Sequence, residues 1–266
     1  MTLFFLNERL IDTARSEDAL IMHPHAQRTG GGTIRRLVLA RQFGSENVYS
    51  RMFQDRVKPW RRLTDADLAG YRAFTDLENF RDIRLNRPVV GLASLRHPLY
   101  RAISLYGLVR SKPDHRHHEL AMNVPLEEFY RRASEENPRY FRELQCRRIC
   151  QRANARLAVE TLHERFVGAG FTNHLSAFVP ALAGVLGWRN LEVHDVAPDE
   201  ERYAAVVTPR LREMVLDQNP NDLMLYETMT AGPPYKILGR SWTDDITRLG
   251  DRLRRSARKV ARRLTP

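Results

Sequence analysis

Cysteine is scarce in this 266-residue sequence, which contains only Cys146 and Cys150. Two cysteines four positions apart form neither a disulfide framework nor a zinc-binding pattern, and they favour a reducing compartment. Long apolar runs are also missing, since no stretch approaches the roughly 18 residues of a membrane-spanning helix. Residues 1–8 lack the basic region of a signal peptide. From these absences we expect a cytoplasmic protein.

Acidic residues are the second shortage, because 32 Asp and Glu stand against 43 Lys and Arg, for a net charge of +11. The imbalance is greatest at residues 240–266, where nine basic residues accompany three acidic ones. Apolar residues recur there every three or four positions, which is typical of an amphipathic helix. We therefore divide the chain into a domain at 1–239 and a basic amphipathic helix or tail at 240–266.

A basic amphipathic helix suits an anionic membrane surface, which would place the protein at the periphery of a membrane. A helix docked on the domain or on a partner subunit is an equal alternative. Nucleic acid is not expected as a partner, because the repeat from Ile246 onward has no aromatic side chains and the domain is only mildly basic.

Strands that alternate with helices predict an α/β domain with a central parallel sheet and helices on both sides, in three layers. An apolar run at 19–22 is followed by a glycine turn and by helical spacing over 33–43. A second run, 89–95, has no polar alternation, as expected for a strand buried on both faces. Pro98 suits the first turn of a helix that runs to about Arg110.

The second half of the chain continues this alternation. We expect two helices within 125–165, separated near Pro138, and then a strand at 166–169. A helix over 172–187 follows, and the last helical region, 209–229, is interrupted at Asn219 and Pro220.

A glycine turn between a strand and a helix is a natural anion cradle, because it presents backbone N–H groups at a helix N-terminus. The turn here comprises Arg28, Thr29, Gly30, Gly31, Gly32 and Thr33. Arg28 can grip phosphate oxygens through two N–H groups, and the threonine hydroxyls add donors. The Gly-Lys-Ser/Thr ending of the nucleotide-hydrolase P-loop is absent. A glycine-rich surface turn without a ligand is the alternative.

Arg96 follows the second buried strand, at the edge of the sheet where open α/β folds bind ligands. Ser104 lies eight residues later, about two turns into the following helix. A guanidinium and a hydroxyl on one edge suit a sugar 3′-phosphate. Alternatively, Arg96 caps a strand end and Ser104 is a surface residue.

These motifs resemble those of heparan-sulfate-type carbohydrate sulfotransferases. Residues 25–33 are similar to the family's 5′-phosphosulfate loop, His-x-Gln-Lys-Thr-Gly-Gly-Thr, and residues 95–106 to its 3′-phosphate motif, Arg-Asp-Pro-x-x-Arg-x-x-Ser. Weaker similarities follow in the family's order at 145–147, 167–172 and 221–227. The resemblance covers roughly residues 19–230.

The resemblance to heparan sulfate 2-O and 6-O sulfotransferases implies a P-loop-like sulfotransferase fold. It also implies that 3′-phosphoadenosine 5′-phosphosulfate (PAPS) donates a sulfo group to a carbohydrate hydroxyl. A tyrosyl-protein acceptor and a catalytically weak nucleotide-binding homologue are the alternatives. The reaction needs no metal, and we interpret residues 115–118, which include three histidines, as a solvated loop.

Two departures from the family pattern concern catalysis. Arg28 stands where the family carries a lysine, which keeps the charge but does not easily donate a proton. No histidine occurs between Arg28 and Arg96, and Tyr71 occupies the position of the family's histidine base. Tyr71 is therefore one candidate base, or an aromatic wall of the acceptor cleft. Asp76 and Glu78 are candidate carboxylate bases.

Overall fold

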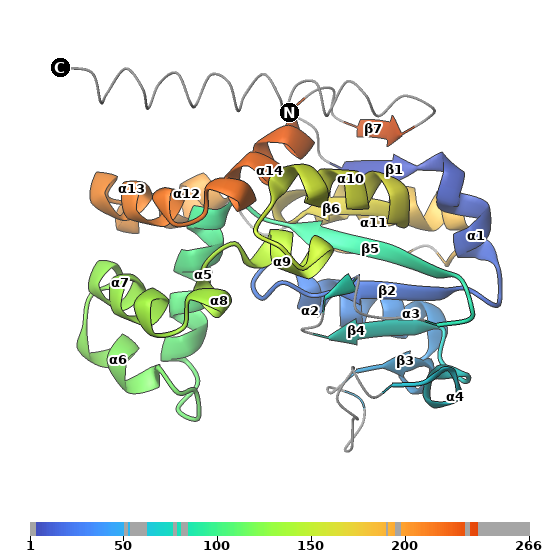
Figure 1. Cartoon of the computed structure of the whole chain (residues 1–266), viewed down its shortest axis with the longest axis horizontal. Helices are drawn as coiled ribbons and strands as arrows, with labels where there is room; N and C mark the ends of the chain where they lie inside the picture. The colour runs from blue at the N-terminus through green and yellow to red at the C-terminus, as the bar shows by residue number, and fades with distance from the viewer. Residues whose placement is uncertain are drawn as a thin grey trace.

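The computed structural model describes residues 4–50, 53, 63–76, 79–80, 85–189, 191–194, 198–231 and 235–238. The basic segment 240–266 lies outside the described residues, and so does the candidate base Glu78. Figure 1 shows the whole chain with its helices and strands labelled. None of the helices in the described ranges is both long and apolar enough to cross a bilayer.

A mostly parallel sheet forms the centre of the protein, in the strand order β3-β4-β2-β5-β6-β1-β7. The first five of these strands run parallel, whereas β1 pairs antiparallel with β6 and β7 pairs parallel with β1. The expected parallel sheet is thus confirmed for its central part, and the edge beyond β6 runs in the opposite direction. The strands are β1 (Phe4–Asn7), β2 (Leu20–Pro24), β3 (Val48–Tyr49), β4 (Ala73–Asp76), β5 (Val89–Leu95), β6 (Phe166–Phe171) and β7 (Tyr235–Leu238).

Helices connect the strands and also gather beyond their carboxyl ends (Figure 1). A π-helical turn (Ile34–Leu39) joins α2 to α3 in one continuous helical segment. The helices are α1 (Ile11–Arg15), α2 (Gly31–Thr33), α3 (Ala40–Phe43), α4 (Asp65–Leu68), α5 (Pro98–Arg110), α6 (His118–Asn123), α7 (Leu126–Glu136), α8 (Pro138–Phe141), α9 (Leu144–Cys150), α10 (Ala155–Arg165), α11 (Leu175–Leu186), α12 (Asp199–Tyr203), α13 (Pro209–Asp217) and α14 (Pro220–Thr230).

The expectation of two helices within 125–165 is wrong, because four helices occupy that range. Pro138 does mark a boundary, between α7 and α8. The other two breaks fall at residues with left-handed backbone, Glu143 (φ +54°) before α9 and Gln151 (φ +67°) after it. A side chain disfavours this conformation, so residue type gives little warning of it.

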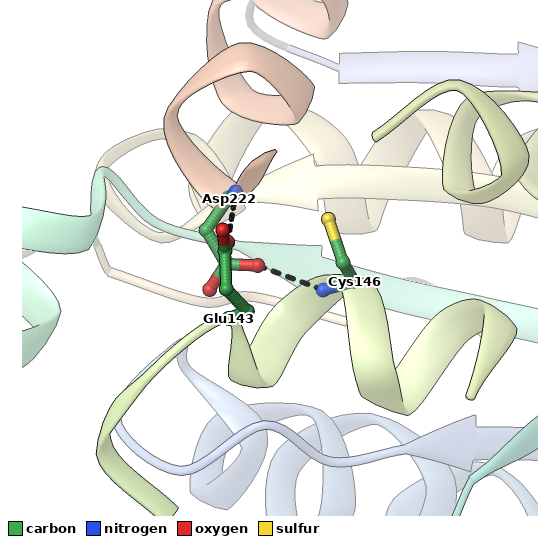
Figure 2. Close-up of side chains that lie close together, drawn as sticks. All are labelled: Glu143, Cys146 and Asp222. Atoms are coloured by element: carbon green, nitrogen blue, oxygen red, sulfur yellow. Dashed lines mark hydrogen bonds between the residues drawn. The ribbon is translucent and has the colours of Figure 1, made fainter. Parts of the chain in front are cut away.

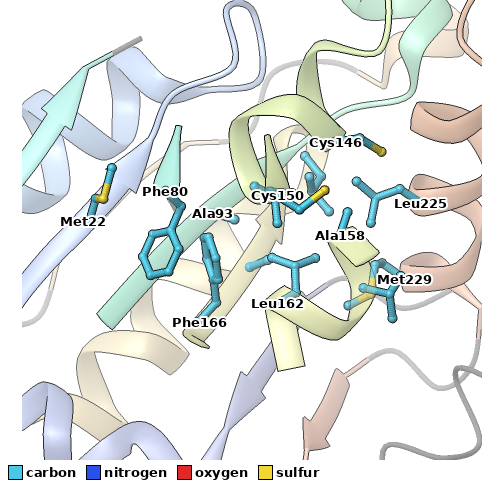
Figure 3. Close-up of a cluster of buried hydrophobic side chains, with 14 of the residues drawn as sticks. Met22, Phe80, Ala93, Cys146, Cys150, Ala158, Leu162, Phe166, Leu225 and Met229 are labelled. Atoms are coloured by element: carbon cyan, nitrogen blue, oxygen red, sulfur yellow. The ribbon is translucent and has the colours of Figure 1, made fainter. Parts of the chain in front are cut away.

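Successive residues of the central strands enter different cores, as period-two geometry requires. Met22 and Ala93 pack with α9, α10 and α14, whereas Ile21 and Leu92 pack with the π-helical turn and α11. The strands are thus buried on both faces, as the apolar run at 89–95 predicts. Figure 3 shows the first of these clusters, with sheet residues facing helical side chains: Met22, Ala93, Phe166, Cys146, Cys150, Ala158, Leu162, Leu225 and Met229.

A third core lies among the helices that gather beyond the carboxyl ends of the strands. It joins α5, α6, α7, α8 and α13 through buried side chains such as Leu105, Ala121, Phe129, Phe141 and Val215. Because α5 follows directly from β5, it begins at the edge of the sheet. The third core packs around α5 and so fixes the position of Ser104, which lies on this helix.

Candidate anion-binding site

Two left-handed residues shape the loop between β2 and α2. The φ angle is +69° at Arg28 and +87° at Gly30. Glycine adopts this conformation freely, whereas a side chain disfavours it. Gly31 serves a different purpose, because a Cβ atom there would lie 2.0 Å from Cδ2 of His25. Left-handed residues within such a turn direct backbone N–H groups into a concave nest for anions.

A buried chain of hydrogen bonds supports this loop from the sheet. The His23 imidazole lies 3.0 Å from the Thr75 hydroxyl and 3.3 Å from the Ser94 hydroxyl. The hydroxyl of Thr29 lies 3.2 Å from that of Ser94 and donates to the carbonyl of Ala26 at 2.8 Å. The expectation that the Thr29 hydroxyl binds phosphate is therefore corrected, since this group is fully buried and stabilises the loop itself.

The loop forms one wall of a cavity of about 650 Å³, a size typical of small-molecule sites. The glycines of the loop, Thr33 and Ser104 line it, together with Asp76 as the one carboxylate among its described lining residues. Six cationic side chains also line it: Arg28, Arg35, Arg36, Arg96, Lys112 and Arg202. This excess of positive charge selects for a ligand with several negative charges.

The π-helical turn helps to bring two of these cations to the cavity. The N–H of Ala40 donates to the carbonyl of Arg35, a span of five residues instead of four. Adjacent side chains diverge less around a π turn than around an α-helix, so Arg35 and Arg36 can both face the cavity. Such turns recur at functional sites.

The two anion-binding motifs predicted from the sequence meet directly in this cavity. Nε of Arg28 donates to the hydroxyl of Ser104 at 2.9 Å, and Nη1 of Arg96 donates to the carbonyl of Arg28 at 3.1 Å. Burial, and then the positive charge of Arg96, lower the pKa of Arg28. An anion between these cations would relieve their repulsion.

Arg96 is also paired with a residue that the sequence analysis did not single out. Its Nε donates to Oδ2 of Asp199 at 2.8 Å, and its Nη2 donates to Oδ1 of the same carboxylate. Nη2 also lies 3.4 Å from the hydroxyl of Tyr203. Burial disfavours the charged form of Arg96, but the hydrogen bonds and charge of Asp199 outweigh this effect and raise the pKa of Arg96.

The backbone of Arg96 is fixed by Gln145 at the start of α9. The Arg96 N–H donates to the side-chain oxygen of Gln145 at 2.9 Å, and the side-chain amide of Gln145 donates to the Arg96 carbonyl at 2.8 Å. One residue earlier, the hydroxyl of Thr172 donates to the carbonyl of Leu95 at 3.1 Å. Two of the weaker sequence similarities, at 145–147 and 167–172, therefore lie at the end of β5.

The third similarity, 221–227, contributes a reciprocal pair of helix caps (Figure 2). The Glu143 carboxylate accepts the backbone N–H groups of Asn221 and Asp222 at 2.9 and 2.7 Å. The Asp222 carboxylate accepts those of Gln145 and Cys146 at 3.1 and 2.8 Å. Each carboxylate thus satisfies N–H groups that the other helix leaves unpaired.

Glu143, Cys146 and Asp222 also lie close enough together to suggest a metal site. The hydrogen bonds of both carboxylates give them a structural role instead, and burial raises the pKa of the Cys146 thiol well above its usual range. A thiol that resists deprotonation is a poor metal ligand. We therefore interpret this cluster as the junction that holds α9 and α14 together.

The two described candidate bases lie at opposite ends of β4. Asp76 ends the strand beside Pro24 of β2 and lines the cavity. Tyr71 precedes the strand, packs with the first core, and makes an edge-on contact with Tyr49 at 5.1 Å between ring centroids. The expectation that Tyr71 acts as the base in this cavity is therefore corrected, because Tyr71 lies at the end of β4 opposite the cavity and is not among its described lining residues.

His25 is a cavity residue to which the sequence analysis gave no role. Burial, followed by the charges of Arg35, Arg148 and Arg28, lowers the pKa of His25 to about 3. Its imidazole is consequently neutral at physiological pH, packed against Gly31 at the floor of the loop. The sequence did contain a signal, since His25 lies between the strand that ends at Pro24 and the glycine turn.

Residues 115–117 form the expected turn, with Arg116 exposed, but the histidines of this segment are not all solvated. His117 is 3% exposed, and Nδ1 of His118 lies 3.1 Å from the carbonyl of Val109 on α5. The interpretation as a solvated loop is therefore wrong for His117. This segment packs on α5 and starts α6.

No protein-family model matches this chain, and no curated protein sequence matches it significantly. The function is therefore inferred from the geometry and charge of the cavity.

Proposed function

We propose that this protein transfers a sulfo group from PAPS to a hydroxyl, on a P-loop-like sulfotransferase fold. The observation that carries the proposal is the contact of the loop at Arg28 with Ser104 and Arg96 in one cationic cavity. A nucleotide with anions at both its 5′ and its 3′ positions needs positive charge at two places. The loop after β2 would supply it at the 5′ position, and the end of β5 at the 3′ position. A glycine turn without a ligand would not account for the six cations around it.

The residues of the cavity fit such a donor. The backbone of Gly30–Thr33 and the side chain of Arg28 would hold the 5′ phosphosulfate, and Ser104 with Arg96 would hold the 3′-phosphate. The donor would supply an activated sulfo group. Arg28 contributes charge at the leaving phosphate, where stabilisation is worth most as the bond to sulfur breaks.

Asp76 is the residue we propose as the base. It lines the cavity at the end of β4, beside the strand that leads into the loop, and Arg35 lies within its electrostatic influence. A carboxylate held there can accept the proton of a hydroxyl that attacks sulfur. His25 is the competing base, although burial and nearby arginines lower its pKa to about 3 and so make it a poorer proton acceptor than an ordinary imidazole.

The proposed acceptor is a carbohydrate hydroxyl, as the family resemblance implies, with a tyrosyl protein as the alternative. One observation favours a second candidate function, a nucleotide-binding homologue with weak catalysis. The position of the family's lysine is occupied by Arg28, which does not readily donate a proton to a leaving phosphate.

Transfer of labelled sulfate from PAPS to a panel of glycans, glycolipids and tyrosine peptides tests the proposal. Transfer to any one of them supports an enzyme and identifies its acceptor class. If the full chain binds 3′-phosphoadenosine 5′-phosphate but transfers sulfate to none, the nucleotide-binding homologue replaces the enzyme. If it binds no adenine nucleotide, both candidate functions are wrong.

A further inference from the structure

Arg96 has little hydrogen-bonding capacity left in this structure. A guanidinium carries five N–H donors, and four of them are engaged. Nε and Nη2 donate to Asp199, Nη2 approaches Tyr203, and Nη1 donates to the carbonyl of Arg28. The paired edge, Nε with Nη2, is one of the two edges with which arginine can grip a phosphate through two parallel bonds, and the other edge shares Nη2 with it.

The ion pair between Asp199 and Arg96 is buried. Its side chain is 1% exposed, and that of Arg96 is 5% exposed, so their pairing is screened little by water. Asp199 begins α12, whose last two residues also reach the site. Arg202 lines the cavity, and the ring of Tyr203 lies 5.6 Å from the guanidinium carbon of Arg96.

Resting on the proposed function, we infer that Asp199 is a carboxylate latch that the donor's 3′-phosphate must displace. Without nucleotide, the carboxylate holds the gripping edge of Arg96. The 3′-phosphate carries more negative charge than a carboxylate and takes that edge when it binds, and Asp199 then leaves with α12. A nucleotide without a 3′-phosphate gains nothing by breaking the pair, so α12 responds only to nucleotides that carry a 3′-phosphate.

The latch makes a quantitative prediction about affinity. If only about a tenth of the molecules have Arg96 released, the apparent affinity for the 3′-phosphate falls about tenfold. Removing the charge of Asp199 releases Arg96 and so recovers the lost affinity. Asp199→Asn should therefore bind 3′-phosphoadenosine 5′-phosphate about tenfold more tightly, while its affinity for adenosine 5′-phosphate changes by no more than about twofold.

Glu200→Gln provides the matched control, because Glu200 is an exposed neighbour of Asp199 on α12 and carries the same charge. Isothermal titration of the full chain with both nucleotides compares wild type, Asp199→Asn and Glu200→Gln. Selective tightening in Asp199→Asn alone supports the latch. Unchanged or weaker binding of the 3′-phosphorylated nucleotide in that variant, with wild-type binding intact, overturns the latch and leaves the proposed function standing.

Asp199→Asn leaves a buried guanidinium partly unpaired and can reduce folding stability, so a second measurement uses the wild type. Hydrogen exchange of the α12 amides should become faster with 3′-phosphoadenosine 5′-phosphate and stay unchanged with adenosine 5′-phosphate. Unchanged or slower exchange with the first nucleotide contradicts release of Asp199. A wild type that binds neither nucleotide overturns the latch and the proposed function together.

Discussion

Nε of Arg28 donates a hydrogen bond to the hydroxyl of Ser104 at 2.9 Å, across 76 residues of sequence. The loop after β2 and the helix after β5 are thus joined at the site and not merely close to it. Each motif alone has an ordinary structural explanation. Their contact, inside a cavity with six cations, is harder to explain without an anionic ligand.

Replacement of Arg28 should impair transfer more than binding. In Arg28→Ala, the rate should fall on the order of 100- to 1,000-fold, because the lost charge acts mainly on the leaving phosphate. The dissociation constant of 3′-phosphoadenosine 5′-phosphate should rise less, since the backbone of Gly30–Thr33 remains. Steady-state kinetics and titration calorimetry measure the two effects. Arg41→Ala, an exposed arginine on α3, is the control.

Equal losses of rate and affinity in Arg28→Ala would mean that Arg28 only anchors the ground state. Arg28→Lys distinguishes charge from geometry, because it introduces the lysine found in the 5′-phosphosulfate loop that residues 25–33 resemble. A rate in Arg28→Lys at or above that of wild type would show that a proton donor improves departure of the phosphate.

The site residues differ in how far sequence could predict them. Arg96 and Ser104 were predictable because the apolar run at 89–95 and Pro98 fix where β5 ends and α5 begins. Asp199 was not, because its ion pair with Arg96 spans 103 residues and leaves no local pattern. Tyr71 was misplaced because β4, a strand of four residues, is too short to be recognised from its pattern, and without that strand its distance from the loop could not be seen.

The elements of the fold also differ in how far the sequence could predict them. Three of the parallel strands, β2, β5 and β6, were predictable from their apolar runs, because they are buried on both faces. The antiparallel β1 depends on pairing with β6, which is a tertiary contact. The breaks at Glu143 and Gln151 require left-handed backbone at residues that disfavour it. At Glu143, the reciprocal caps with Asp222 supply compensating hydrogen bonds, and these form only in the folded protein.

Asp76→Asn should lower the rate of transfer without weakening nucleotide binding. The substitution keeps the size of the side chain and removes the proton acceptor, so the rate of transfer should fall on the order of 100- to 10,000-fold. Nucleotide affinity should not weaken, because a negative charge leaves a cationic cavity. Single-turnover measurement of sulfate transfer provides the rate. If His25→Gln loses activity while Asp76→Asn retains it, His25 is the base.

Asp222→Ala should destabilise the protein by removing one of the two reciprocal caps between α9 and α14. It leaves the N–H groups of Gln145 and Cys146 without their acceptors, at a cost of about 1–3 kcal/mol in the free energy of unfolding. Urea unfolding followed by circular dichroism measures this cost. Asp217→Ala, at an exposed position on α13, is the control. Equal stability of the two variants would contradict the reciprocal caps.

Stability should fall as pH decreases from about 6.5, because His25 remains neutral in the folded protein. The folded pKa of about 3 lies below the ordinary value of 6.5, so the unfolded chain binds the extra proton throughout that interval. The buried His25 then contributes a slope approaching about 1.4 kcal/mol per pH unit. Urea unfolding between pH 4.5 and pH 6.5, the upper part of this interval, should show a smaller slope in His25→Gln. Identical slopes would contradict a neutral, buried imidazole.

The central claim is that one cavity binds a nucleotide through anions at both its 5′ and 3′ positions. Differential scanning calorimetry of the full chain, with 3′-phosphoadenosine 5′-phosphate and separately with adenosine 5′-phosphate, tests it most directly. At 100 times its dissociation constant, the first nucleotide should stabilise the folded protein by about 2.7 kcal/mol. The second, at the same concentration, should stabilise it much less. Equal shifts in melting temperature would contradict a 3′-phosphate site at Arg96 and Ser104.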